Sequence, residues 1–245
     1  LFTLFIFYEI LTLSTFPLVT HKGDAKARRG GRVYLAILMG ASIGLLLPAI
    51  VWTYALTGTV DFTLGGILAG HVDAAGPLVP VLLGLFVFGI AKAALMPAHS
   101  WLPNAMVAPT PVSAFLHAVA VVNAGAYGVL RIMTDIFGVD LMVALELDQI
   151  GIWLASFTVV AASLYALRLD NLKALLAFST IGQLAYIVLG GSLANGDGTL
   201  GGMLHILNHG VSKITLFLCA GAIYIATHKK YVSEMHGLVR EMPLT

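Results

Sequence analysis

The chain has 245 residues, of which 59% are hydrophobic and only 10% are charged, and its mean hydropathy is +0.94. A soluble domain carries roughly 25% charged residues, so this composition excludes an ordinary soluble domain and favours a membrane protein. The formal net charge of +1 excludes a broad basic face for nucleic acid, and the single cysteine, Cys219, excludes an internal disulfide framework.

Seven apolar stretches are long enough to cross the hydrocarbon core of a bilayer, which takes about 20 helical residues. Because open sheets cannot satisfy their edges in lipid, these stretches predict an all-α, polytopic membrane helix bundle. The stretches cover residues 1–20, 34–57, 78–97, 110–133, 149–168, 172–193 and 199–227. We interpret residues 1–245 as a single transmembrane domain and as a fragment of a longer chain, because the first apolar run already contains Leu1.

Basic residues in the loops predict the orientation of the spans. Lysine and arginine gather at 21–33, 168–173 and 228–240, which alternating crossings place on one side of the membrane. We expect this side to be the cytoplasmic side of a cell membrane. The loops at 58–77 and 194–198 contain no lysine or arginine, and Arg131 is the exception to the pattern. The Gly-rich loop 58–77, which holds Asp61, His71 and Asp73, predicts a loop or a short interfacial helix.

Four prolines indicate that the third and fourth spans are interrupted. Proline inside a helix removes a backbone hydrogen bond, and broken helices at membrane depth often mark a transport site. A simple loop between two spans is the alternative. The prolines are Pro97, Pro103, Pro109 and Pro111.

Glu9 and Lys92 are charged residues inside apolar runs. Glu9 precedes the basic cluster that begins at Lys22 by thirteen positions, which is roughly 20 Å of helix. It is either a protonated glutamate hydrogen-bonded within the bundle or a proton or ion relay. A lysine at the centre of a span costs about 2.5–3.5 kcal/mol to insert, so Lys92 is expected to face the bundle interior. Because Lys92 lies close to Pro97, extension of its side chain to the interface is the alternative.

The strongest local pattern is His205-x3-His209-x3-Lys213, which puts three titratable side chains on one helix face. A proton relay, plain structural hydrogen bonding and a metal site are the open interpretations. The H-E-x-x-H pattern of metalloproteases is absent, and we expect no metal. Asn208 and Ser212 are predicted to hydrogen-bond alongside this row.

His117 and Asn123 lie inside the fourth span and add two polar groups to the predicted relay. A lone helical histidine is more often a structural hydrogen-bond partner, but beside Lys92 and the row on the last span His117 becomes a candidate relay station. The sequence at 196–201 matches G-x-G-x-x-G, but both flanks are membrane spans rather than a βαβ unit, so it predicts a flexible turn. No cofactor-binding motif is recognised.

Three segments resemble the antiporter-like subunits of respiratory complex I and of Mrp-type multisubunit sodium/proton antiporters. They are 91–106 (AKAALMPAHSWLPNAM) continued by 108–114 (APTPVSA), 204–214 (LHILNHGVSKI) and 170–180 (DNLKALLAFST). The resemblance covers nearly the whole chain and implies a fold of inverted repeats with discontinuous helices. It further implies partner membrane subunits, with protons and Na⁺ as candidate ions.

The same resemblance assigns roles to matched positions. Glu9 matches a buried glutamate, Lys92 the lysine paired with it, and Lys213 a central lysine linking two half-channels. His117, His205 and His209 match relay stations. Asn123 departs from the family, because several members have a lysine there, and this leaves open how the relay passes that point.

Three functions compete on this basis. The first is an Mrp-type antiporter subunit, in which separation of a Glu9–Lys92 pair drives a proton toward Lys213; such a pair at ~4 Å contributes about 4 kcal/mol at an effective dielectric of ~20. The second is a proton-pumping subunit of a complex I-like oxidoreductase or membrane-bound hydrogenase, in which partner subunits perform any enzyme chemistry. The third is a membrane scaffold, which the buried charges argue against.

Overall fold

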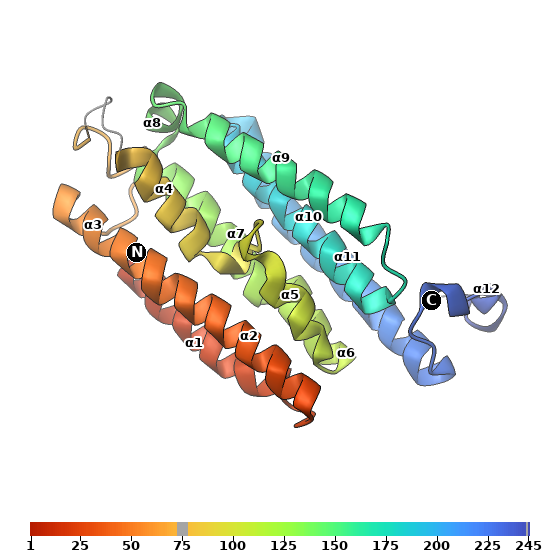
Figure 1. Cartoon of the computed structure of the whole chain (residues 1–245). Coiled ribbons are helices and arrows are strands. Elements are labelled where there is room, and N and C mark those ends of the chain that lie inside the picture. Colours follow the sequence, from red (N-terminus) through yellow and green to blue (C-terminus); the bar gives the residue numbers. More distant parts are fainter. Residues whose placement is uncertain (73–77, 244) are drawn as a thin grey trace.

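The computed structural model describes residues 1–72, 78–243 and 245, and most of the described residues are helical (Figure 1). Asp73 lies outside the described residues, and the described part of the 58–77 segment is a loop of turns. The α-helices are α1 (Phe2–Val19), α2 (Ala25–Ala41), α3 (Leu47–Thr57), α4 (Leu78–Gly89), α5 (Trp101–Asn104), α6 (Thr110–Ala114), α7 (Val121–Arg131), α8 (Val139–Ala144), α9 (Leu147–Ala166), α10 (Leu172–Ser192), α11 (Gly196–Thr227) and α12 (Leu238–Glu241).

Six continuous helical segments in the described part are long and apolar enough to cross a membrane, and α4 is a shorter apolar helix. Two of the six are composite. A π-helical turn at Ser42–Leu46 joins α2 to α3, and π-helical turns at Phe115–Val119 and Ile132–Phe137 extend α6 and α7 into the segment Thr110–Phe137. The prediction of an all-α, polytopic membrane bundle is therefore confirmed.

The second span begins earlier than its hydropathy indicates, at Ala25 instead of residue 34. Asp24 caps this helix, because its carboxylate accepts a 2.6 Å hydrogen bond from the backbone N–H of Ala27. A side-chain cap of this kind satisfies an amide that the helix itself leaves unpaired. The polar first turns therefore form helix although they add nothing to the apolar length.

The predicted third span, 78–97, ends as an α-helix at Gly89. A 3₁₀ turn at Ala91–Ala93 and the left-handed residue Ala94 follow, and two more 3₁₀ turns flank α5. The interruption thus comes before Pro97, and Lys92 lies inside it. Pro103 lies within α5, Pro109 caps α6 and Pro111 occupies the first turn of α6.

The bundle has two outer groups of helices with the interrupted segment between them (Figure 1). Helices α1 and α2 lie on one side, α9, α10 and α11 on the other, and α4 to α7 in the middle. The outer face of α9 carries the exposed apolar side chains Trp153, Phe157, Val160 and Leu164 at helical spacing. An exposed apolar face of this kind is suited to contact with lipid chains.

The three basic loops gather at one end of the bundle. Residues 170–172 form backbone hydrogen bonds with residues 230–232, and Asn171 and Tyr231 form an isolated β-bridge. One cavity is lined by Lys22, Lys173 and Lys230, so all three basic stretches meet there. The structure thus places the three basic stretches at one end of the bundle. The compartment that this end faces stays a prediction.

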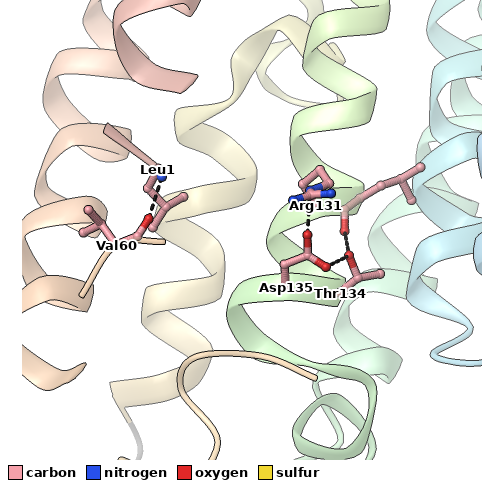
Figure 2. Close-up of polar contacts among 6 residues, drawn as sticks. Leu1, Val60, Arg131, Thr134 and Asp135 are labelled. Carbon is pink, nitrogen blue, oxygen red and sulfur yellow. Dashed lines mark hydrogen bonds and ion pairs between the residues drawn. The ribbon is translucent and has the colours of Figure 1, made fainter. Parts of the chain in front are cut away.

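Arg131 lies toward the opposite end, where it is paired (Figure 2). Its Nε lies 2.5 Å from a carboxylate oxygen of Asp135, one turn further along, and its guanidinium lies 4.7 Å from the centre of the Phe62 ring. Thr134 donates to the other Asp135 oxygen at 2.9 Å, and the nearby Leu1 amine donates to the carbonyl oxygen of Val60 at 2.6 Å. The exception to the charge pattern is therefore a locally neutralised residue.

Candidate functional site: two buried polar clusters

Lys92 is fully buried and lies against Tyr8 of α1. Its ammonium lies 3.3 Å from the centre of the Tyr8 ring and donates a hydrogen bond to the Tyr8 carbonyl oxygen. Its backbone N–H donates to the Tyr8 hydroxyl at 3.1 Å. Tyr8 therefore contacts Lys92 through its ring, its hydroxyl and its backbone, and cation–π attraction is stronger where water is excluded.

Glu9 does not form the direct ion pair with Lys92 that the sequence predicts. Within the described residues, the side-chain ion pair closer than 4.0 Å is that of Arg131 and Asp135. Both carboxylate oxygens of Glu9 are buried and accept no hydrogen bond. Successive helix residues point about 100° apart, so the helix that directs Tyr8 at Lys92 turns Glu9 away. This is a correction to the predicted pairing.

The interrupted segment around Lys92 is held by side chains that replace the missing helical hydrogen bonds. The indole Nε1 of Trp101 donates to the carbonyl oxygen of Ala91 at 2.8 Å, and the backbone N–H of Met96 donates to the Thr158 hydroxyl at 3.3 Å. Gly125 of α7 packs directly on the turn, because a Cβ placed there would lie 2.7 Å from the Lys92 Cβ. Buried backbone polar groups need such partners in lipid, and the segment can persist because it has them.

The predicted row on α11 faces α10. The Lys213 ammonium donates to the Ser179 hydroxyl at 2.7 Å, and His205 Nε2 lies 2.8 Å from the side-chain oxygen of Gln183. His209 and Lys213 are buried, whereas His205 is half-buried. The two α11 residues that bind α10, His205 and Lys213, are eight positions apart, and their partners Ser179 and Gln183 are four apart, so α10 meets both ends of the row.

His117 joins this row from the neighbouring span. It is fully buried in the π-helical turn, neither ring nitrogen has a hydrogen-bond partner, and its backbone oxygen lies 3.3 Å from His209 Nε2. The His205 and His209 rings lie 6.5 Å apart, and within the described residues no third His, Cys, Asp or Glu completes a metal-ligand group with them. The arrangement is a line of titratable side chains.

Asn123 lies between the row and the interrupted segment. Its side-chain nitrogen donates to the carbonyl oxygen of Ala118 at 2.7 Å, while its side-chain oxygen is buried without a partner. A Cβ placed on Gly210 of α11 would lie 3.6 Å from the Asn123 nitrogen. Helix α7 therefore contacts the Lys92 turn at Gly125 and α11 near Asn123, and it lies between the two clusters.

Two predicted members do not join the row. Asn208 and Ser212 are exposed, because each directly precedes a member of the row and its side chain therefore points about 100° away from that member. Their predicted hydrogen bonds alongside the row are absent among the described residues. Periodicity defines the two faces of α11, but it cannot tell which polar side chains face a neighbour.

The structure adds four residues that the sequence did not single out. They are Tyr8, Ser179, Gln183 and Lys173. Ser179 and Gln183 are polar residues four apart in an apolar span, which is a signal that the sequence does carry. Lys173 donates to the carbonyl oxygens of Met106 at 3.0 Å and Ala108 at 2.7 Å, which fixes the segment after the interruption to α10.

The chain is similar to known membrane proteins over its whole length. The chain matches the family model "NADH:quinone oxidoreductase/Mrp antiporter, TM" over residues 1–245. It is 34% identical over 248 residues to the NADH-quinone oxidoreductase subunit N of Desulforudis audaxviator, with all of this chain and 48% of that protein covered. The chain therefore spans about half the length of that relative.

Two solved structures share the fold. A chain of the archaeal membrane-bound sulfane sulfur reductase superposes with a TM-score of 0.84 at 32% identity, over 99% of this chain and 49% of that one. A chain of the Mrp complex from Dietzia sp. DQ12-45-1b superposes with a TM-score of 0.79 at 32% identity, over 91% of this chain and 24% of that one. The protein is a multi-span membrane protein and belongs to the NADH:quinone oxidoreductase/Mrp antiporter transmembrane family.

Proposed function

We propose that this chain forms the core of a subunit that translocates protons or monovalent cations within a multisubunit membrane complex of the Mrp antiporter type. The single observation that carries the proposal is the line of buried titratable side chains at His117, His209 and Lys213. His209 contacts the backbone oxygen of His117, and Lys213 donates to Ser179 of α10. Ionisable groups held inside spans are costly, and they are kept where a proton or ion passes.

The relay has a route to the basic end of the bundle. A cavity of about 560 Å³ is lined by Arg168 and Asp170 at that end and by Ser179 and Gln183 further in. Ser179 and Gln183 are the hydrogen-bond partners of Lys213 and His205. By the positive-inside rule this end faces the cytoplasm, so we assign the cavity as the cytoplasmic access of the relay.

Lys92 and Glu9 form the second element of the mechanism. Lys92 rests on Tyr8, and the carboxylate of Glu9, the next residue of α1, has no hydrogen-bond partner. Movement of the Lys92 ammonium from Tyr8 to Glu9 would bring opposite charges together. It would also change the electric field along α7. Glu9 and Lys92 thus act as a switch with a resting position on Tyr8, and α7 transmits its state toward His117.

A second candidate function is supported by the relatives themselves. One is a subunit of an NADH-quinone oxidoreductase and one solved structure is an archaeal respiratory complex, so the same relay serves a redox-driven proton pump equally well. In that case partner subunits supply the electron transfer. Genes for small antiporter subunits beside this one would favour exchange, and genes for quinone or iron–sulfur subunits would favour the pump.

The experiment that tests the relay replaces its lysines in the full-length chain within its native complex. Lys213→Ala and Lys92→Ala should abolish proton movement in inside-out vesicles, measured by quenching of a pH-sensitive dye after addition of Na⁺ or of an electron donor. Arg29→Ala, which removes a positive charge at an exposed position outside both described cavities, is the control. Gel electrophoresis of the intact complex checks assembly, and full activity in both relay variants would contradict the proposal.

A further inference from the structure

A second cavity lies at the basic end of the bundle, and no relay residue lines it. Its volume is about 770 Å³, and five lysines from distant parts of the chain line it: Lys22, Lys26, Lys173, Lys229 and Lys230. Such convergence brings together charges that repel one another. It therefore calls for an anion to compensate them.

The cavity's own carboxylate does not neutralise this charge. Among the described residues that line it, Asp24 is the one acid, and it is engaged in capping α2 through the Ala27 amide. Lys173 is also engaged, by two backbone carbonyls. Among the described residues, the ammonium groups of the other four lysines donate no hydrogen bond and form no ion pair; the Lys230 ammonium lies 5.3 Å from the centre of the Tyr224 ring. The cavity therefore keeps a net positive charge.

The remaining walls are apolar and continue onto a surface suited to lipid. Met106, Val107, Leu218 and Ile225 line the cavity, and Leu218 and Ile225 are 53% and 78% exposed on α11. The lysines lie at the ends of spans, at the level where headgroups meet water. Basic pockets between membrane helices recognise anionic headgroups in this position.

We propose that this cavity is a binding site for an anionic phospholipid, with its phosphate held by Lys22, Lys26, Lys229 and Lys230 and an acyl chain lying along α11. None of the relay residues lines this cavity. An occupied site would hold the α1–α2 loop, the start of α10 and the end of α11 together.

The test uses the full-length chain in its purified complex, reconstituted in phosphatidylcholine that contains a photoactivatable phosphatidylglycerol. Mass spectrometry should map labelled peptides to 103–111 and 218–235. Lys22→Gln with Lys230→Gln should lower this labelling roughly 10-fold. Arg168→Gln with Arg240→Gln removes the same charge from exposed positions outside the cavity and should leave labelling unchanged.

Three results would overturn the lipid site. Equal loss in both double variants would show general surface attraction, and displacement by inorganic phosphate at millimolar concentration would show a small-anion site. Absence of labelling, with the lysines protected from acetylation in the intact complex, would show that a partner protein covers the cavity. All four substituted residues are exposed, so their replacement should leave the fold intact.

Discussion

The ammonium of Lys92 lies on the face of the Tyr8 ring, 3.3 Å from its centre, while the carboxylate of the adjacent Glu9 has no partner. A lysine that rests on an aromatic ring keeps its charge stabilised without being neutralised. The Lys92 ammonium can therefore still pair with a carboxylate such as that of Glu9. The predictions below follow from this contact and from the packing around it.

Tyr8→Phe and Tyr8→Leu should separate two roles of this residue. Tyr8→Phe keeps the ring but leaves the Lys92 amide without its acceptor, so it should lower stability by about 1–3 kcal/mol and preserve ion movement. Tyr8→Leu also removes the cation–π contact, and transport in vesicles should fall about 10-fold. Equal transport in the two variants would show that the ring has no role.

Gly125→Ala should displace the turn that carries Lys92. The added Cβ would lie 2.7 Å from the Lys92 Cβ, and overpacking of this kind costs about 1–3 kcal/mol. Gly128→Ala on the same helix is the control, because its Cβ would meet Ile90 at 3.5 Å, an ordinary contact. The unfolding temperature of the complex in detergent should fall for Gly125→Ala alone. The transport rate should fall in the same variant.

Ser179→Ala should slow ion movement by about 10-fold, because it removes the 2.7 Å acceptor of the buried Lys213 ammonium. Ser179→Thr, which restores a hydroxyl, should recover most of the rate. Ser163→Ala is a suitable control. Ser163 lines the same cavity as Ser179, but its hydroxyl donates to the carbonyl oxygen of Val159 within its own helix. Initial rates of dye quenching in vesicles make the comparison, and an unchanged rate for Ser179→Ala would remove Ser179 from the relay.

The contact of Asp170 with the chain after α11 should weaken in acid. Hydrogen bonds from the Ser233 hydroxyl and amide hold the pKa of the exposed Asp170 carboxyl below its ordinary value of 3.8. The unfolded chain therefore takes up the proton first, so the stabilisation is present above that ordinary value and is lost as the pH falls through the lower folded pKa.

Hydrogen exchange of the Ser233 amide, corrected for the intrinsic pH effect, measures this directly. Protection should hold at neutral pH and disappear in acid below the ordinary Asp range. Asp170→Asn should reduce protection and abolish its acid transition, because the amide has no carboxyl proton to gain. An acid transition that persists in Asp170→Asn would assign it to another group.

The sequence by itself determined the membrane class and most of the spans. Each segment that crosses the lipid must be a long apolar run. Because this requirement concerns neighbouring residues only, it is visible in the sequence. The clustering of basic residues at one end follows from the same alternation of spans and loops. The order of His205, His209 and Lys213 on one helix face also follows from helical periodicity alone.

The tertiary structure decided which groups meet. Prolines indicated an interruption, but the α-helix ends earlier, at Gly89, where the contacts of Tyr8, Trp101 and Gly125 support a turn. The same packing places Tyr8, and not Glu9, against Lys92. It also selects Ser179 over Ser212 as a polar neighbour of Lys213. Such choices depend on the rotation of one helix against another, and a single helix carries no information about its partner's rotation.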